Sequence, residues 1–559
     1  MLANISKSQK IFVMIGTMLA LLMSALDQTI VATAMPKIVS DLNGLEHLSW
    51  VFTAYMLSST VIVPIYGKLS DIYGRKYFIL AAVVIFLTGS VLSGLSQNMI
   101  QLIIFRAVQG IGAGAIFANA FAIIGDLFSP SERGRWQGLF GGVFGIASVV
   151  GPTLGGWLTD NASWRWNFFI NIPVGILALL AVGFLMPRIV PDTKNRSVDY
   201  IGSIFLTIGL ISLLLGFVWG GSQYAWNSIQ IISLFLIALV SIIIFGIVEK
   251  KVKEPVLPLE LFKNPIFSVS MLIVFLTGIG MFGAILYVPL FAQIVLGVSA
   301  TNSGTILTPL MLSLVAGSII TGQIISKTGK YKYLAVFGSG IGAVTIYFLS
   351  SMTATTTQEE LLIRMIATGV GLGITLPIFT LAVQNAFDHS KLGVATASTQ
   401  LFRSIGATVG TAVLGGVLNA SLTSKLGDLS SDPFLKMVSK LNPEFNPEKI
   451  DVNRLQAILT GGIRQQIEDK IMNLPPSIKP QVVVSFNEFI LKTKQAFASS
   501  ITEVFFIASI LMALSFIASL FLKEIPLRKS QGERPGLEQA GIELAEEEGQ
   551  FPPKDELKI

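Results

Sequence analysis

The sequence predicts an all-α polytopic membrane protein with about fourteen transmembrane helices, arranged as two six-helix halves and an inserted pair. Three observations predict this class. Of the 559 residues, 52% are hydrophobic and only 13% are charged, whereas about a quarter of the residues of a soluble domain are charged. The charges gather between apolar runs long enough to cross a hydrocarbon layer of roughly 30 Å as helices. One sequence motif also recurs at a fixed distance along the chain.

The apolar runs define the spans in chain order. We expect spans at residues 11–35, 49–68, 77–96, 100–125, 137–158, 166–186, 199–219, 228–248, 266–297, 302–326, 333–352, 359–386, 393–422 and 498–522. An even number of spans puts both termini on the same side of the membrane. The first span follows a short basic N-terminus and lacks a small-residue cleavage site, so we expect the mature protein to retain it.

The loops between the spans differ in charge, and this difference predicts the orientation. One set of alternate loops is rich in basic residues: Lys68, Arg75, Lys76, Arg133, Arg135, Arg188, Lys194, Arg196, Lys250, Lys251, Lys253, Lys263, Lys327, Lys330 and Lys332. The opposite short loops carry almost none, chiefly Lys37 and Arg165. Because cytoplasmic loops are rich in Lys and Arg, we expect a multi-pass protein of the cell (inner, cytoplasmic) membrane with both termini in the cytoplasm.

An internal repeat relates the two halves. The sequence GKLSDIYGRK at 67–76 is echoed by GQIISKTGK at 322–330, an offset of 255 residues, and two glycines near the fifth span recur at the same offset near the thirteenth. Parallel halves related by an axis normal to the membrane are typical of transporters that rock between two states.

The repeat divides the chain into four parts. We expect an N-terminal six-helix half at 1–186, two inserted helices with flanking loops at 187–265, a C-terminal half at 266–522 and a disordered cytoplasmic tail at 523–559. The segment 423–497 is an extracytoplasmic insertion in the second half. Its mixed apolar and charged residues at helical spacing predict packed amphipathic helices, the last of which runs into the final span.

The composition excludes several kinds of chemistry. The chain has no cysteine and two histidines, which excludes disulfides, thiolate metal sites and thiol nucleophiles, and we expect no metal site. The glycines at 110–114 lie inside an apolar span and lack the Lys-Ser/Thr ending of a phosphate-binding loop. We expect no enzyme, no cofactor and no nucleic-acid partner. Transport would then be driven by an ion gradient or run downhill.

Five motifs follow one another in the first half. They are LDQTIVATAMP at 26–36, GKLSDIYGRK at 67–76, RAVQGIGAG at 106–114, GIASVVGPTLGG at 145–156 and WRWNFFINIPVG at 164–175. Together they resemble the major facilitator superfamily, specifically its fourteen-helix branch of drug:proton antiporters of the multidrug efflux type. The second, third and fourth motifs are similar to the superfamily's motifs A, B and C.

This resemblance implies a proton-coupled antiporter that exports hydrophobic or amphipathic compounds by alternating access. The proton gradient would drive it, and its partners would be protons, a small hydrophobic substrate and membrane lipid, with the chain acting as a monomer. Two alternatives stay open. The segment 423–497 suggests export of a lipid or lipid-linked molecule, and a sensor or scaffold without flux would share the fold.

Asp27 is the strongest candidate for proton coupling. It lies in the middle of the first span, where an ionised carboxylate is costly unless it meets a cation or takes up a proton. Burial favours its neutral form, whereas a nearby Arg106 favours its ionised form, so the pair could bind and release a proton. The alternative is a permanent Asp27–Arg106 ion pair that only holds two helices together.

The resemblance to motif A implies a conformational latch formed by Gly67, Asp71, Gly74, Arg75 and Asp126. The glycines allow a tight turn and close helix contact. The simpler alternative is that the basic residues only set topology, but topology does not require Asp71. The resemblance implies that Asp71 docks at the start of the thirteenth span near residues 393–396, where a carboxylate is favourable, and that Arg75 and Asp126 complete the network. In the second copy Ser326 replaces the aspartate.

Two further sets of residues complete the candidate site. The resemblance assigns Gly145, Gly151, Pro152, Gly155 and Gly156 to the antiporter motif, where small residues allow close helix packing and the proline kinks the helix. A central substrate cavity is expected to be lined by Tyr55, Gln109, Phe117, Phe144 and Phe379. We interpret Arg403 as supporting helix packing rather than binding substrate.

Overall fold

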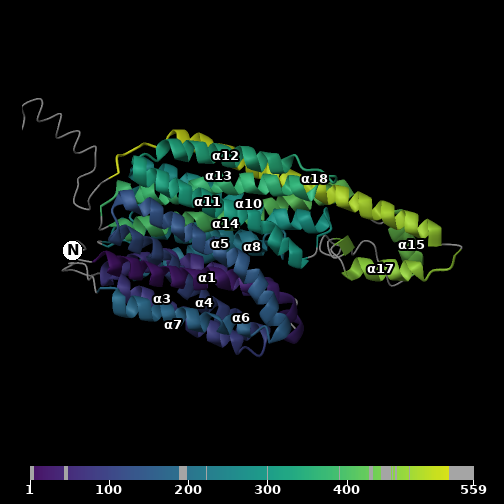
Figure 1. Ribbon diagram of the computed structural model, residues 1–559, viewed down its shortest axis with the longest axis horizontal. Coiled ribbons are helices and arrows are strands. Elements are labelled where there is room, and N and C mark those ends of the chain that lie inside the picture. Colours follow the sequence, from purple (N-terminus) through teal and green to yellow (C-terminus); the bar gives the residue numbers. More distant parts are fainter. Residues whose placement is uncertain are drawn as a thin grey trace, which may run out of the picture.

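The computed structural model shows a bundle of long helices. It describes residues 6–42, 48–187, 198–221, 223–252, 254–298, 300–388, 391–426, 432–441, 455, 458–459, 462–476 and 479–527. Within these residues, 14 helices are long and apolar enough to cross a membrane. The predicted all-α class and the number of spans are therefore confirmed. The helices run along the long axis of the molecule (Figure 1).

Two groups of six spans make up most of the molecule. The first group contains α1 (Lys7–Leu42), α2 (Leu48–Tyr73), α3 (Arg75–Gly94), α4 (Met99–Leu127), α5 (Pro130–Asn161) and a span formed by α6 (Trp166–Phe169) and α7 (Asn171–Leu185). The second group contains α10 (Pro265–Ile294), α11 (Ala300–Thr328), α12 (Lys332–Ser350), α13 (Gln358–Ala386), α14 (Leu392–Leu426) and α18 (Lys479–Leu520).

Polar residues and prolines set where several helices begin. The Asn98 side chain accepts the N–H of Gln101 at the start of α4, and Asn264 caps α10 in the same way before its first residue, a proline. At α5, the N–H of Ser129 donates to Glu132 Oε2 at 3.2 Å, and the helix again begins with a proline, Pro130. These caps leave few unpaired N–H groups at the helix starts.

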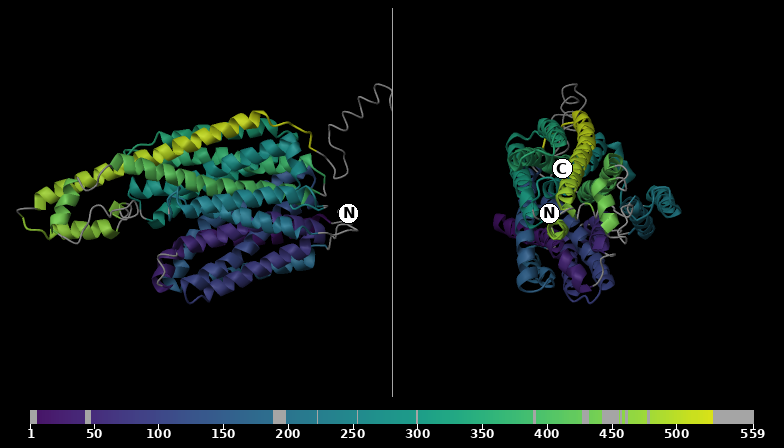
Figure 2. Two further views of the ribbon diagram at one scale, coloured as in Figure 1. Left: turned by 180° about the vertical axis from the view of Figure 1, so that it is seen from behind. Right: turned by 90° about the vertical axis from the view of Figure 1, so that its right-hand side faces the viewer.

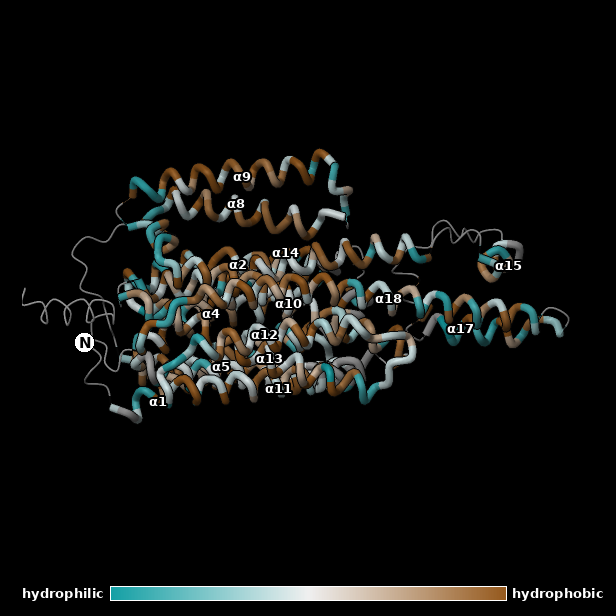
Figure 3. Tube along the Cα trace, turned by 90° about the horizontal axis from the view of Figure 1, so that it is seen from above, coloured by the Kyte–Doolittle hydropathy of each residue, from teal (hydrophilic) through white to brown (hydrophobic). Residues whose placement is uncertain are grey.

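The inserted pair consists of α8 (Tyr200–Trp219) and α9 (Ile229–Glu249). The two helices pack against each other and stand apart from the rest of the bundle, and both are strongly apolar (Figure 3). On the inner side, α8 contacts α2 and α14. A short 3₁₀ helix, η2 (Leu259–Lys263), then leads into α10.

A helical segment projects from one end of the bundle. It contains α15 (Pro433–Leu441), α17 (Gly462–Met472) and the first part of α18, which has 42 residues and is therefore about 63 Å long, twice the hydrocarbon thickness. The ring of Phe434 lies 5.0 Å from that of Phe486 and 5.5 Å from that of Phe489. The described part of 423–497 is thus packed helix, as predicted, and its last helix continues into the final span. The predicted tail from residue 528 onward lies outside the described residues.

The two halves meet at one end of the bundle and diverge toward the other. We name the end where α1 begins and α18 ends the near side, and the end that carries α15 and α17 the far side. The most extensive contacts between the halves are those of α2 with α14 and of α5 with α11, and smaller ones join α4 with α14 and α5 with α13. Both views of the ribbon show the two groups of helices separating toward the far side (Figures 1 and 2).

Candidate functional site

A buried charge cluster joins α1, α4 and α7. Arg106 Nη1 donates to Asp27 Oδ2 at 2.5 Å. Gln109 Nε2 and Asn171 Nδ2 donate to Asp27 Oδ1 at 2.8 and 3.1 Å. The side chains of Asp27 and Arg106 are 0% and 1% exposed. The structure therefore brings the two predicted residues together as an ion pair, and three donors bind one carboxylate.

This cluster is buried in the far-side part of the first half. Asp27 lies twenty residues beyond Lys7, about 30 Å from the near-side start of α1, and Arg106 lies seven residues beyond Met99, about 10 Å from the far-side start of α4. Arg106 and Gln109 are three residues apart in α4 and so project from the same face. An ionised carboxylate is tolerated at such depth because it is paired and fully hydrogen-bonded.

Tyr55 separates the charge cluster from a central cavity. The Arg106 guanidinium carbon lies 4.1 Å from the centre of the Tyr55 ring, within the range of a cation–π contact. The hydroxyl of Tyr55 is 3.2 Å from Ser24 Oγ. Tyr55 also lines the cavity, but Asp27 and Arg106 do not. The ion pair is therefore one side chain away from the cavity.

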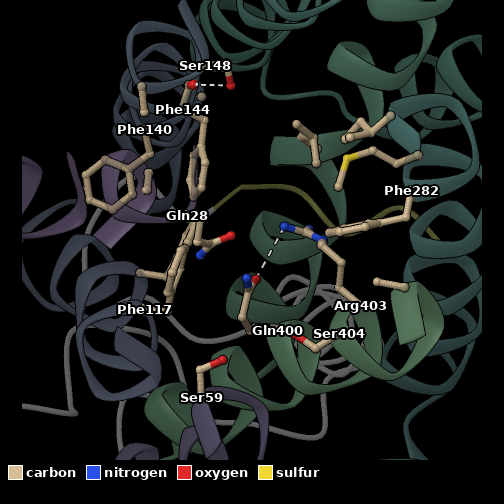
Figure 4. Close-up of a pocket in the computed structure, with 18 of the residues that line it drawn as sticks. Gln28, Ser59, Phe117, Phe140, Phe144, Ser148, Phe282, Gln400, Arg403 and Ser404 are labelled. Atoms are coloured by element: carbon tan, nitrogen blue, oxygen red, sulfur yellow. Dashed lines mark hydrogen bonds between the residues drawn. The ribbon is translucent and has the colours of Figure 1, made fainter. Parts of the chain in front are cut away.

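The cavity lies between the two halves and has a volume of about 300 Å³. Phe117 and Phe144 line it on the first half, with stacked rings 5.6 Å apart. Phe282 and Arg403 line it on the second half, as Figure 4 shows. Tyr55, Phe117 and Phe144 thus lie where the sequence predicted. A mostly apolar cavity of this size suits a small amphipathic molecule.

Gln109 and Phe379, which the sequence also placed in the cavity, do not line it. Gln109 is fully buried and its amide binds Asp27 and Arg106 instead. Phe379 is packed in the core of the second half and borders only a void of about 10 Å³ beside Arg403. Pro377 of the same helix does face the cavity, and a residue two positions further on points to the opposite side of a helix.

Arg403 and Gln28 are two of the polar cavity residues that sequence reasoning missed. The sequence assigned Arg403 to helix packing, but its guanidinium points into the cavity (Figure 4). A lone charge within an apolar run of α14 is the signal that could have found it. Gln28 follows Asp27 in the chain and faces the cavity, while Asp27 faces α4.

The small residues of the predicted antiporter motif lie along α5 with different surroundings. A side chain at Gly145 would meet Val315 of α11, and one at Gly151 would meet Thr29 of α1. Thr29 Oγ1 also donates to the carbonyl of Ala147 at 2.9 Å. Gly155 is buried, whereas a Cβ at Gly156 would have no atom within 4 Å. The motif therefore mediates close contact at Gly145 and Gly151 but not at Gly156. Pro152 lies within α5, and its side-chain surroundings are outside the described part of the chain.

A charge network on the near side links the first half to the start of α14. Asp71 forms an ion pair with Arg75, and its Oδ2 accepts the N–H of Val394 at 3.1 Å. Arg75 Nε donates to Asp126 Oδ2 at 2.9 Å. The structure thus brings the predicted latch residues Asp71, Arg75 and Asp126 together at the helix start where the resemblance placed them.

Two glycines make this network possible. Gly67 packs against Ala397 and the carbonyl of Gly393 in α14, so that a side chain there would separate α2 from α14. Gly74 has a φ of 98°, a conformation that favours glycine, and it allows the chain to turn from α2 into α3.

Gln384 of α13 is a further link between the halves that the sequence did not reveal. Its amide nitrogen donates to the carbonyl of Phe121 at 3.1 Å, and its amide oxygen accepts from Gln137 Nε2 at 3.1 Å. Arg133 Nη1 lies 3.4 Å from the carbonyl of Gln384. These contacts lie on the near-side half of the bundle and help to close it.

The near side is therefore closed, and the cavity lies beyond the closure. Along α5 and α11, Gly134 contacts Gly322, Gly138 contacts Ile319, and Gly145 contacts Val315. Beyond Gly145, Gly151 of α5 faces Thr29 of α1 rather than α11. The geometry is that of a state closed toward the near side.

Two bundles of six spans around a central cavity form the architecture of a membrane transporter. The family model for the Major Facilitator Superfamily matches residues 17–411. Multidrug transporter protein MdtP of Bacillus subtilis (strain 168) is 41% identical over 531 residues, 94% of this chain and 95% of that protein. Multidrug resistance protein 3 of the same organism is 38% identical over 514 residues, 91% of this chain and 94% of that protein.

The fold comparison agrees with the sequence comparison. The crystal structure of the human organic anion transporter MFSD10 (TETRAN) is similar with a TM-score of 0.56 and 13% identity, covering 90% of this chain and 99% of that chain. At this identity the likeness concerns the fold alone. The chain belongs to the major facilitator superfamily and is a membrane transporter of its multidrug efflux type, not an enzyme.

Proposed function

We propose that the protein is a proton-coupled antiporter that exports hydrophobic or amphipathic compounds by alternating access. The observation that carries this proposal is the buried Asp27–Arg106 pair, which is separated from the cavity by Tyr55 alone. A carboxylate that is this close to a binding cavity and closed off from water can link proton binding to substrate binding. The relatives named as multidrug transporters support export of small molecules.

Protonation of Asp27 would act on the cavity through Arg106. A neutral carboxyl group no longer attracts the guanidinium, so the bonds from Arg106, Gln109 and Asn171 weaken together. Arg106 lies against the ring of Tyr55, and a shift of this guanidinium would move a cavity wall. Proton and substrate would then favour different states, which is the linkage that exchange requires.

One proton per cycle provides enough free energy for useful export. A charge that moves down about 150 mV releases roughly 3.5 kcal/mol, scaled from about 2.3 kcal/mol per 100 mV. Since about 1.36 kcal/mol corresponds to a factor of ten, this sustains a gradient of a few hundredfold for a neutral substrate. A single carboxylate is therefore sufficient.

The distribution of basic residues supports a cytoplasmic near side. Lys68, Lys76, Arg135, Lys250 and Lys327 all lie at near-side helix ends, as expected for cytoplasmic loops. Under this orientation both described ends of the chain lie in the cytoplasm and the structure is closed to it. The projecting helices of the far side would lie outside the cell membrane.

The proposal is tested by flux through the purified protein in liposomes. Ethidium and 8-anilinonaphthalene-1-sulfonate serve as amphipathic probes, and a pH gradient is imposed. We expect Asp27→Asn to lower gradient-driven accumulation at least tenfold, equivalent to about 1.4 kcal/mol, while counterflow exchange remains. Asp41→Asn is the matched control, because Asp41 is an exposed carboxylate at the far end of the same helix.

Two outcomes would overturn the proposal. If Asp27→Asn still accumulates the probes uphill, the Asp27–Arg106 pair is static and the energy comes from elsewhere. If the wild-type protein moves a headgroup-labelled phosphatidylglycerol but neither probe, it exports lipid, the alternative that the packed far-side segment around Phe434 favours.

A further inference from the structure

Among the described residues that line the central cavity, Arg403 is the one with a charged side chain. It lies eleven residues beyond Leu392, the first residue of α14, or about 16 Å along the helix. With a hydrocarbon thickness of roughly 30 Å, this is near the middle of the membrane. A cation at such a depth is expensive and usually has a functional partner.

The structure gives Arg403 no acidic partner within the described residues. Its one side-chain hydrogen bond is a long one, from Nη1 to Gln400 Oε1 at 3.4 Å, although a guanidinium has five N–H donors. The nearby charges of Asp27 and Arg106 cancel within their own pair. The cavity region therefore carries one uncompensated positive charge.

The wall opposite Arg403 is apolar and flat. Phe117 and Phe144 present stacked rings, with an interplanar angle of 26°, and Figure 4 shows the guanidinium pointing from α14 toward this side of the cavity. Gln28 and Ser404 add neutral hydrogen-bonding groups to the lining. The cavity thus offers an aromatic surface on one half and a planar cation on the other.

We propose that this cavity selects acidic amphiphiles, with a carboxylate or sulfonate at Arg403 and an apolar body against Phe117 and Phe144. This proposal deepens the proposed export function by naming its substrate class. A guanidinium binds a carboxylate or sulfonate through parallel N–H···O bonds. An anionic substrate supplies the negative charge that the protein itself does not place beside Arg403, whereas a cationic compound adds a second positive charge to the site.

Binding in lipid nanodiscs of phosphatidylcholine tests this assignment without any ion gradient. The probes are 8-anilinonaphthalene-1-sulfonate and N-phenyl-1-naphthylamine, which share one ring skeleton and differ by the sulfonate. Fluorescence is measured with empty nanodiscs subtracted. We expect Arg403→Gln to weaken binding of the sulfonate about 10- to 100-fold, the usual range for a lost hydrogen bond to a charged group, and to change the neutral probe less than about threefold.

Two further variants separate binding from folding. Arg403→Lys keeps the charge and should retain most of the affinity for the sulfonate. Arg364→Gln is the matched control: Arg364 lies in α13, donates to Ser351 Oγ at 3.0 Å and does not line the cavity. It should leave the affinity for both probes unchanged.

Two results would contradict the proposed role of Arg403. Equal losses for both probes in Arg403→Gln, without rescue by Arg403→Lys, would show that Arg403 supports packing only. Tighter binding of tetraphenylphosphonium than of the sulfonate by the wild-type protein would overturn the anionic preference. These binding measurements need no proton gradient. The anionic preference can therefore be refuted while the flux difference in Asp27→Asn still supports the antiporter, and the reverse also holds.

Discussion

The two helix pairs that close the near side occupy equivalent places in the internal repeat, yet different interactions hold them. Between α2 and α14, the carboxylate of Asp71 accepts the N–H of Val394 and pairs with Arg75. Between α5 and α11, Gly134 and Gly322 bring two backbones into direct contact, and Ser326 stands where the repeat would place a second aspartate. Both pairs include a close glycine contact, and the α2–α14 pair adds a charged one.

The starts of α14 and α5 explain this difference. The N–H of Val394 near the start of α14 is available to Asp71, and the positive end of the helix favours a carboxylate. The start of α5 is already capped, because Ser129 binds Glu132 and the first residue is Pro130, which has no N–H. A carboxylate at position 326 would find no comparable donor there.

The register of the two pairs also differs. The offset of 255 residues relates Gly67 to Gly322 and Gly138 to Gly393. Gly67 contacts Gly393, but Gly322 contacts Gly134, one helical turn before Gly138. In addition, α8 packs against α2 and α14. In the proposed alternating-access cycle, the charged contact would break and re-form, whereas the glycine contact suits a tightly packed pivot.

The largest effect is expected from a side chain in the glycine contact. A Cβ at Gly322 would overlap the carbonyl of Gly134, so Gly322→Val should force α5 and α11 apart. Overpacking of this kind costs about 1–3 kcal/mol, which shifts the population away from the closed near side by roughly 5- to 150-fold. We expect a comparable loss of transport and a longer distance between spin labels at Arg135→Cys and Lys327→Cys.

The labels are simple to introduce because the chain has no cysteine. Gly416→Val is the matched control, since a Cβ at Gly416 would have no atom within 4 Å. Unchanged label distances in Gly322→Val would mean that α5 and α11 adapt to the extra volume, and the difference between the two helix pairs would then disappear.

A smaller effect is expected from the charged contact. Asp71→Asn removes the ion pair with Arg75 and weakens the bond to Val394, although Arg75 keeps Asp126. Both side chains are about nine-tenths buried, with 11% and 7% exposed, so a loss of about 1–2 kcal/mol is expected. Labels at Tyr73→Cys and Lys391→Cys should report a shift toward the open near side of roughly 5- to 30-fold.

Glu254→Gln provides the matched comparison, because Glu254 pairs with Lys68 on the same side but is 37% exposed. Its effect should be close to zero, as for most exposed ion pairs. Equal responses of Asp71→Asn and Glu254→Gln would show that general near-side charge, rather than docking on α14, holds this contact.

The sequence was informative where a residue type can be placed in lipid at low free energy in only one way. Apolar runs interrupted by charge define the fourteen spans, since only helices satisfy the backbone in lipid. Asp27 and Arg106 lie in apolar spans with few other charged residues. Each is therefore the natural partner of the other. A carboxylate that topology does not require drew attention to Asp71, and the family resemblance supplied its docking site on α14.

The sequence was less informative about which face of a helix points to the cavity. Gln109 and Phe379 have the chemistry of cavity residues, but rotation of α4 and α13 about their axes turns them into the packed interior. The rotation of α14 about its axis instead turns Arg403 toward the cavity. These orientations depend on contacts between helices far apart in the chain, which composition and spacing do not encode. The open space beside Gly156 likewise depends on how α5 packs against its neighbours, which the motif alone does not indicate.

The smallest effect is expected from restoring the symmetry of the repeat. Ser326→Asp supplies the carboxylate that the second copy lacks, but Pro130 and the Ser129–Glu132 pair leave it without the N–H that Val394 gives Asp71. Such a surface change alters stability by about 0.5 kcal/mol or less, so transport and the Arg135–Lys327 label distance should stay within about twofold. If the near side of Ser326→Asp instead stays closed, α5 can bind a carboxylate as α14 does. The two contacts would then differ only because their sequences differ at position 326.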